Sequence, residues 1–307
     1  MARRIAKSTH TMNSPHSLSL RGLLAGLTAA SIWGGMYVVS KVVLDVIPPF
    51  ALLTTRLVLG FLSLWLVIAY QAHGFHLSRR QWLEAIGVGL VGYGISLGFQ
   101  FVGTKLSTAA NGALVTSATP ALVLPFAFLL LNEAVTPRRL LAIAVASLGV
   151  LAVIDPRQAN LSSNLFLGNL SLLAAALTWA LYSVLVRRVT TNGMDLLQAT
   201  AVFLLGGLPV TIPFGLWELT TQGLGKITLG VIGGILFLGI ISTAIAMFLW
   251  NYAFAVLPAS VASLTFFAQP VVGTLLGWLF LGEKITPLFV LGGVLIGIGI
   301  LISNENG

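Results

Sequence analysis

Ten long apolar segments, separated by short polar stretches, constrain the fold of this chain more than any other feature of its sequence. They cover residues 22–40, 48–69, 82–102, 108–131, 140–154, 165–186, 196–217, 229–252, 259–281 and 288–303. About 20 apolar residues in a helix cross the ~30 Å hydrocarbon core of a bilayer. The sequence therefore predicts an all-α integral membrane protein with ten transmembrane helices.

The charge content supports this prediction. Only 8% of the 307 residues are charged and 57% are hydrophobic, whereas soluble domains contain about 25% charged residues. So few charges cannot cover the surface of a soluble protein of this size, so apolar side chains must face lipid. The 33 glycines favour close packing of membrane helices in one bundle. The chain has no cysteine, which excludes disulfides and thiolate metal ligands.

The positions of lysine and arginine predict the orientation of the chain. If residues 1–20 form a cytoplasmic tail, ten basic residues lie on the cytoplasmic side, five on the outer side, and Arg56 within a segment. Cytoplasmic loops of membrane proteins carry the excess of Lys and Arg. We therefore expect both termini in the cytoplasm and the protein in the bacterial cytoplasmic membrane. Because the basic residues are scattered, the net charge of +8 does not indicate nucleic-acid binding.

The chain repeats itself at about half its length. The sequence NEAVTP (132–137) returns as GEKITP (282–287) at an offset of 150, and at an offset of 146 Gly22, Trp33 and Gly60 match Gly168, Trp179 and Gly206. Each half holds five segments, an odd number, so the second half enters the membrane inverted relative to the first. We predict a first five-helix repeat over 21–156 and a second over 157–307, arranged around a central cavity. Inverted repeats of this kind are a recurring transporter architecture with the substrate near the midplane.

These features resemble the EamA-type transporters of the drug/metabolite transporter superfamily. The resemblance rests on the Trp33-Gly34 pair, the helices with Pro120 and Pro270, and the two Asn/Gly-Glu-x-x-Thr-Pro turns, and it extends from about residue 20 to 303. It implies ten helices in an inverted five-plus-five arrangement, a central cavity, and export or exchange of amino acids or related metabolites. The second half departs from this pattern, because its first helix has Trp179-Ala180 in place of Trp-Gly.

Polar and aromatic side chains recur at helical spacing on the candidate cavity helices. We predict that the substrate is bound by a set drawn from both halves: Trp33, Tyr37, Tyr93, Ser96, Gln100, Asn111, Trp179, Tyr182, Trp250 and Gln269. A buried amide in hydrocarbon needs a polar partner, which a substrate carboxylate or amine can supply. Aromatic side chains also anchor helices at membrane interfaces, and amides also join neighbouring helices. The sequence leaves open whether each residue binds substrate or has one of these structural roles.

Two basic residues are candidates for gating or for binding a substrate charge. Arg56 lies eight positions into its segment, about 12 Å deep at 1.5 Å per residue, and an ionisable group at such depth is a functional-site candidate. Its alternative roles are to bind carbonyl groups at the end of a neighbouring helix or to extend its charged group outward to the membrane surface. Lys41 ends the first segment on the same helix face as Trp33 and Tyr37, where it either contacts a substrate carboxylate or marks the interface.

The two glutamates of the repeated turns are expected to have a structural role. Glu133 and Glu283 each precede a Thr-Pro pair. Thr is suited to the N-cap of a helix, Pro to its first turn, and a carboxylate to the dipole of the helix start. We therefore expect both glutamates to stabilise the helices that begin at Pro137 and Pro287.

The positions of acids and histidines limit the possible functions. All eight acids lie at segment ends or in loops, and all four histidines lie in the tail or one loop, so a proton relay is not expected. No phosphate-binding loop occurs. We expect facilitated diffusion or exchange of a small molecule by alternating access, without a cofactor or metal and without enzymatic activity. The expected partners are lipid and, as an open possibility, a second copy of the chain in a homodimer. One alternative is a membrane-embedded enzyme acting on a lipid-linked substrate, which needs convergent acids, histidines or a metal. Another is a non-transporting membrane subunit, which would have a solidly packed centre.

Overall fold

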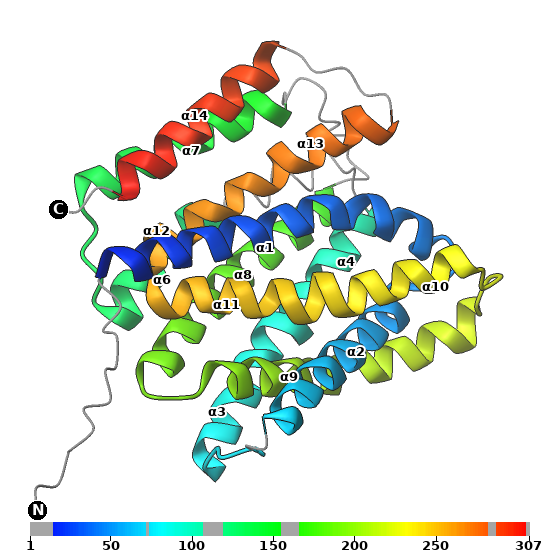
Figure 1. Ribbon diagram of the computed structural model, residues 1–307. Helices are drawn as coiled ribbons and strands as arrows, with labels where there is room; N and C mark the ends of the chain where they lie inside the picture. The colour runs from blue at the N-terminus through cyan, green and yellow to red at the C-terminus, as the bar shows by residue number, and fades with distance from the viewer. Residues whose placement is uncertain (1–14, 72–73, 107–118, 155–165, 282–286, 305–307) are drawn as a thin grey trace, which may run out of the picture.

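The structure is a computed structural model that describes residues 15–71, 74–106, 119–154, 166–281 and 287–304 (Figure 1). The first half contains α1 (Pro15–Leu44), α2 (Pro49–Tyr70), α3 (Arg79–Gly89), η1 (Leu90–Ser96), α4 (Leu97–Leu106), α6 (Thr119–Leu131) and α7 (Pro137–Ile154). The second half contains α8 (Phe166–Thr191), α9 (Leu196–Gln222), α10 (Leu229–Leu236), η4 (Phe237–Ile245), α11 (Ala246–Val256), α12 (Ala259–Leu264), η5 (Thr265–Phe267), α13 (Ala268–Leu281) and α14 (Pro287–Asn304). These ranges contain helices and no strand, which confirms the all-α prediction for the described residues.

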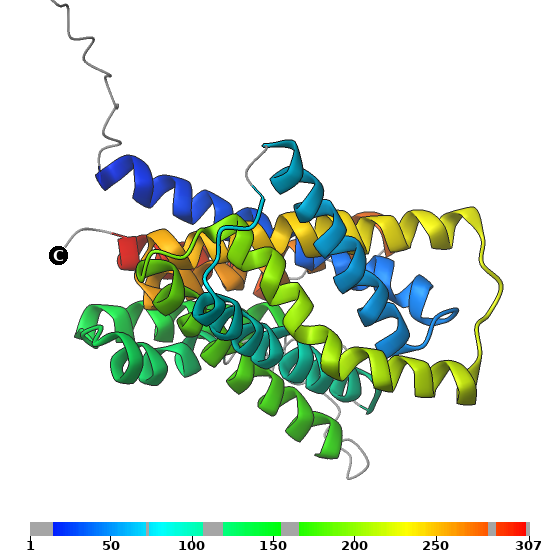
Figure 2. The ribbon, with the colours of Figure 1, turned by 90° about the horizontal axis from the view of Figure 1, so that it is seen from below.

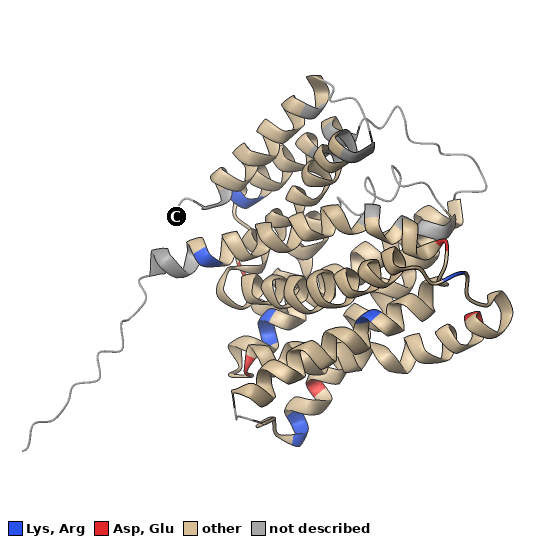
Figure 3. Cartoon of the chain, turned by 45° about the vertical axis from the view of Figure 1, so that its right-hand side comes forward, with Lys and Arg blue, Asp and Glu red and all other residues tan. Residues whose placement is uncertain are grey.

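Several helical runs in the described part of the chain are long and apolar enough to cross a membrane. Five qualify by length and composition: Pro49–Tyr70, Arg79–Gly103, Phe166–Thr191, Leu196–Gln222 and Leu229–Val256. Shorter apolar helices lie at Thr119–Leu131, Ala259–Gly273 and Val290–Ile302. A helix satisfies all its backbone hydrogen bonds internally, which lipid requires of any spanning segment. The described charged residues lie mostly near helix ends and loops (Figure 3). The chain is thus a multi-pass helical membrane protein.

The helix packing follows the repeat. Helix α1 packs against α11 and α13, and α8, at the matching place in the second half, packs against α4 and α6. The remaining helices pair across the halves: α2 contacts α9, and α7 lies beside α14 at one edge of the bundle (Figure 1). Each of these contacts has a counterpart when the two halves are exchanged. The first helix of each half therefore packs against the third and fourth helices of the other half.

Both halves interrupt their third helix with a short π-helix. The segment η1 separates α3 from α4, and η4 separates α10 from α11. A π-helix widens the hydrogen-bond spacing to i→i+5, and such segments occur frequently at functional sites. The pattern of apolar residues does not predict these segments, which place irregular backbone in the middle of two membrane helices.

Glycines allow two equivalent helix crossings. A Cβ atom at Gly89 of α3 would lie 2.0 Å from the carbonyl oxygen of Phe203 on α9, and one at Gly206 of α9 would lie 2.3 Å from the carbonyl oxygen of Ile86. Gly60, the repeat counterpart of Gly206, lies at the crossing of α2 with η4, where a Cβ would meet Thr243 Cγ2 at 2.8 Å. Figure 2 shows α9 passing beside α2 and α3. The repeat thus keeps small residues on the second helix of each half, where that helix crosses a third helix.

The Thr-Pro turn of the first half is partly as expected. Pro137 is the first residue of α7, and the Thr136 hydroxyl accepts a hydrogen bond from the Arg139 N–H at 3.2 Å, so Thr136 caps this helix as predicted. Glu133 was predicted to stabilise the helix that begins at Pro137, and this prediction was wrong. Its carboxylate instead accepts a hydrogen bond from the Ala259 N–H at 2.8 Å, at the start of α12. Backbone geometry after α6 directs Glu133 across to the other half. The prediction for Glu283 lies outside the described residues.

Candidate substrate cavity

A central cavity that is partly open to the outside lies between the two halves. Residues from both halves line it: Trp33, Met36, Arg56, Ser96, Leu97, Gln100, Thr119, Ala175, Ala176, Trp179, Met247, Phe266 and Gln269. The lining is mostly apolar, with few polar groups. Such a combination is typical of sites that bind small molecules.

Two polar groups of the cavity lining are buried without a hydrogen-bond partner among the described residues. They are the indole N–H of Trp179 and the side-chain carbonyl oxygen (Oε1) of Gln269. A buried polar group without a partner costs about 1–3 kcal/mol, and each such group calls for an explanation. The cavity therefore presents one hydrogen-bond donor and one acceptor that a ligand can satisfy.

Arg56 brings a positive charge to the same cavity. Its residue is only 4% exposed. Nε donates to the Thr243 hydroxyl at 3.2 Å, and Nη2 lies 3.4 Å from both the Ser242 hydroxyl and the Met36 sulfur. These contacts help to orient the guanidinium. The structure thus shows Arg56 both bonded to a neighbouring helix and lining the cavity, although its partners in that helix are hydroxyls and not the carbonyls expected from the sequence.

Arg56 and Trp33 both donate hydrogen bonds to residues of the π-helix η4. The Trp33 indole N–H donates to the backbone carbonyl of Ser242 at 3.0 Å, and the Thr243 hydroxyl donates to the carbonyl of Leu238, five residues earlier, at 2.7 Å. Carbonyls of η4 therefore accept side-chain donors from within η4 and from α1. This arrangement fixes the Trp33 ring against the cavity.

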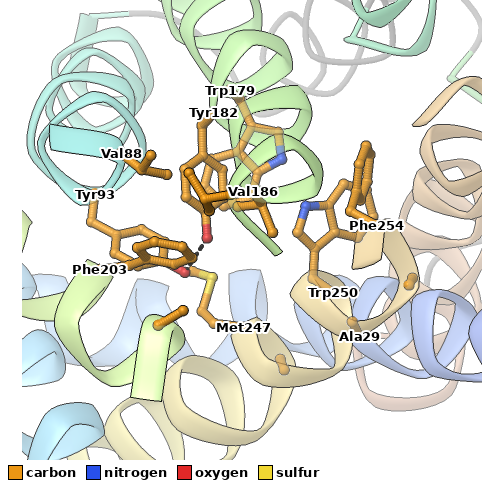
Figure 4. Close-up of a cluster of buried hydrophobic side chains, with 14 of the residues drawn as sticks. Ala29, Val88, Tyr93, Trp179, Tyr182, Val186, Phe203, Met247, Trp250 and Phe254 are labelled. Atoms are coloured by element: carbon orange, nitrogen blue, oxygen red, sulfur yellow. Dashed lines mark hydrogen bonds between the residues drawn. The ribbon is translucent and has the colours of Figure 1, made fainter. Parts of the chain in front are cut away.

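Tyr93, Tyr182 and Trp250 lie beside the cavity without lining it. All three are completely buried, and Figure 4 shows the Tyr93 and Tyr182 hydroxyls directed at each other. The two oxygens are 2.5 Å apart, Tyr182 donates to Asn251 Oδ1 at 2.7 Å, and Asn251 donates to the Thr200 hydroxyl at 3.1 Å. This chain of hydrogen bonds joins η1, α8, α11 and α9. Substrate binding by Tyr93, Tyr182 and Trp250 remains a prediction, while their structural contacts are established.

Replacing Tyr182 by Phe is expected to lower the stability of the protein in detergent. The change removes the donor to Asn251 Oδ1 and the hydroxyl that bonds to Tyr93, so it weakens a buried hydrogen-bond network at a cost of about 1–3 kcal/mol. Thermal unfolding followed by tryptophan fluorescence would measure the loss. Tyr70→Phe is the matched control, because Tyr70 is 92% exposed. Equal melting temperatures for the two variants would contradict the structural role of the network.

The structure brings half of the predicted substrate residues together in the cavity. Trp33, Ser96, Gln100, Trp179 and Gln269 all line it. The side chains of Tyr37 and Lys41, and all of Asn111, lie outside the described residues. Sequence reasoning missed Met36, Thr119 and Phe266. The sequence repeat could have identified Thr119, because it matches Gln269 at an offset of 150, just as Trp33 matches Trp179 at an offset of 146.

The described residues contain no group of three His, Cys, Asp or Glu placed to hold a metal ion. The polar groups of the cavity lining are instead two indoles, two amides, hydroxyls and a guanidinium. These groups form hydrogen bonds and bind anionic groups.

Known proteins resemble this chain over most of its length. A sequence profile of the EamA-like transporter family matches residues 20–154 and 166–304. The "Uncharacterized transporter YyaM" of Bacillus subtilis (strain 168) is 30% identical over 229 residues, which are 74% of each chain. The "Uncharacterized transporter YoaV" of the same organism is 25% identical over 288 residues, covering 92% of this chain and 96% of the relative. A crystal structure with 21% sequence identity has the same fold, with a TM-score of 0.78 over 92% of this chain and 98% of that chain. The chain therefore belongs to the EamA-like transporter family.

Proposed function

We propose that this protein moves a small amphipathic solute, an amino acid or a related metabolite, across the cytoplasmic membrane through the central cavity. The observation that carries the proposal is the pair of unsatisfied polar groups, Trp179 N–H and Gln269 Oε1, in a cavity that also contains the Arg56 guanidinium. A solute that binds there supplies an acceptor for the indole and a donor for the amide. Membership of a transporter family supports transport as the function of this cavity.

An amino acid has the groups that this lining accommodates. Its carboxylate is attracted to Arg56 and accepts from the Trp179 indole, and its ammonium group donates to Gln269 Oε1. An apolar side chain then packs on Trp33, Phe266 and the methionines of the lining. Aromatic rings and polarisable methionine side chains provide contact area with little demand on ligand shape.

The proposed mechanism is alternating access between two inverted five-helix halves. It is supported by the exchange symmetry of the helix contacts, in which α1 with α11 and α13 corresponds to α8 with α4 and α6. A cavity lined by both halves can open to either side when the halves move relative to each other. In this proposal ten helices span the membrane and both termini lie in the cytoplasm. Binding to lipid and to a second copy of the chain is compatible with it, and the second copy is not needed for transport.

The two alternative functions are less well supported. A non-transporting subunit would have a solidly packed centre without a cavity. Tyr93 and Trp250 are buried in this way, but a partly open cavity lined by Gln100 lies beside them. A membrane-embedded enzyme would need acids or histidines near its substrate, and the described lining residues include neither.

Removal of the Gln269 amide is expected to weaken solute transport selectively. In proteoliposomes loaded with a panel of labelled amino acids, the wild-type protein should release at least one class faster than empty vesicles do. Gln269→Leu should raise the half-saturating concentration of that solute about tenfold, since a lost hydrogen bond in a buried site is worth about 1–3 kcal/mol.

Thr211→Val is the matched control for this experiment. The Thr211 hydroxyl on α9 is also buried without a partner among the described residues, but it is not part of the cavity lining. Its replacement should leave transport unchanged. If folded wild-type protein releases no member of the panel, the amino-acid assignment fails, and a broader metabolite panel then tests transport itself.

A further inference from the structure

The Glu133 carboxylate joins the two halves of the molecule at one end of the bundle. Its Oε1 lies 3.1 Å from Arg187 Nε at the end of α8 and accepts the Ala259 N–H at the start of α12. Its Oε2 accepts the Ser260 hydroxyl at 3.2 Å and lies 3.6 Å from Arg139 Nη1. The Glu133 side chain is only 12% exposed. A single carboxylate from the first half thus contacts two elements of the second.

The backbone that ends α6 directs Glu133 toward the second half. Asn132 has a φ of +54°, the left-handed conformation that Asn tolerates better than most residues. The Glu133 N–H bonds back to the Ala127 carbonyl at 3.2 Å and completes the turn. The second copy of the motif has Gly282 at the position of Asn132, a residue that also accepts this conformation. The Asn132-Glu133 pair therefore has a physical explanation: Asn132 turns the chain and Glu133 contacts the other half.

Arg187 connects this carboxylate to the helix beside the cavity. Besides the ion pair, its Nη1 donates to the backbone carbonyls of Phe254 and Leu257 at the end of α11. The Phe254 ring packs on Trp250 with centroids 5.0 Å apart, and Trp250 in turn contacts Phe266 at 5.5 Å. Phe266 lines the cavity. The cavity, the aromatic layer and the ion pair therefore follow one another toward the same end of the bundle.

We propose that Glu133 and Arg187 form an ionic lock that holds this end of the cavity closed and opens when the protein changes its direction of access. Opening this end requires α6 to separate from α8 and α12, and that movement breaks the contacts of the carboxylate with the second half. A switch between discrete arrangements of packed helices is a common form of conformational change. The sequence has Glu283 and Lys41 at the matching repeat positions, so both halves keep an acid and a base there. The inference rests on the alternating access proposed above.

Distances between spin labels test the lock directly. The chain contains no cysteine, so Val135→Cys and Asn192→Cys introduce a unique pair of labels, one in each half. Val135 is 41% exposed and Asn192 is also exposed, so labelling should not disturb the core. Pulsed electron paramagnetic resonance of the reconstituted protein should show mainly one short distance. In the Glu133→Gln variant, which keeps the shape and removes the charge, the population with a longer distance should rise about fivefold, because hydrogen bonds to charged groups are among the stronger ones.

Glu84→Gln is the matched control. Glu84 forms a 2.8 Å ion pair with Arg80 within helix α3. Its removal should leave the distance distribution unchanged, since exposed pairs on one helix contribute little. An unchanged distribution in Glu133→Gln would overturn the lock.

Two further measurements keep the result interpretable. If Glu133→Gln does not fold, Arg187→Lys keeps the charge but loses the several directed donors of the guanidinium. It should shift the distances in the same direction, and no shift would overturn the lock. Solute efflux from the same vesicles is measured separately. If the substitutions shift the distances but the wild-type protein releases no solute, the lock is retained and the proposed function is rejected. If the wild-type protein releases solute but the substitutions leave the distances unchanged, the proposed function is retained and the lock is rejected.

Discussion

Replacing Arg56 by Gln is expected to lower solute efflux at least about 30-fold. Arg56 is 4% exposed, lines the cavity and bonds to Ser242 and Thr243 of η4. Removing one partner of a buried, hydrogen-bonded charge interaction costs about 2–5 kcal/mol or more, which corresponds to this loss. Initial efflux rates from proteoliposomes with matched protein content would measure the effect. Arg80→Gln is the control, because the Arg80 side chain is 88% exposed.

A second measurement separates the two roles of Arg56. If the guanidinium binds the solute, excess solute should raise the melting temperature of the wild-type protein, and this rise should disappear in Arg56→Gln. Arg56→Lys keeps the charge but loses the forked donors that reach η4, so it should retain part of the rise and melt lower without solute. Efflux within twofold of wild type for Arg56→Gln would contradict any role of this residue in transport.

Among the glycines of the described helices, replacing Gly89 by Ala is expected to cause the largest loss of stability. The new Cβ would lie 2.0 Å from the Phe203 carbonyl oxygen and 2.6 Å from its carbonyl carbon. These are backbone atoms of α9, so no side-chain rotation can make room, and α3 and α9 must move apart. Overpacking of this kind costs about 1–3 kcal/mol and occasionally more. The melting temperature and the fraction of monodisperse protein in detergent would both fall.

The same helix provides a control for this substitution. A Cβ added at Gly87, two residues earlier on α3, meets no atom within 4 Å. Gly87→Ala should keep or slightly raise the melting temperature, because Ala has a higher helix propensity than Gly. If Gly89→Ala and Gly87→Ala melt together, the close crossing of α3 and α9 is not a determinant of stability.

The helical, membrane-spanning character of the chain and its internal repeat follow from the sequence alone. Long apolar segments have few alternatives in lipid, because the backbone must satisfy its own hydrogen bonds there. Repeated positions also identified part of the cavity, since Trp33 and Trp179 match at an offset of 146 and both line it. These features depend on local composition and on comparison of the chain with itself, which need no knowledge of packing.

The partners of individual side chains followed from tertiary structure. Helical spacing placed Tyr93 and Ser96 in the same candidate set, yet Ser96 lines the cavity while Tyr93 bonds to Tyr182 in the packed core. Glu133 precedes the helix that starts at Pro137 but contacts Ala259, 126 positions along the chain. The π-helices η1 and η4 likewise have no equivalent in the pattern of apolar residues.

The physical reason for this division is the range of the interactions. The sequence by itself determined how many residues are apolar, how they are spaced and where they recur, and lipid turns that information into helices. Whether a polar residue on such a helix meets a cavity, another helix or a free carbonyl depends on how the two halves pack. Only the tertiary structure determines these partners. There α1 and α8 each pack against helices of the opposite half, and polar groups of Trp179 and Gln269 remain unsatisfied in the cavity.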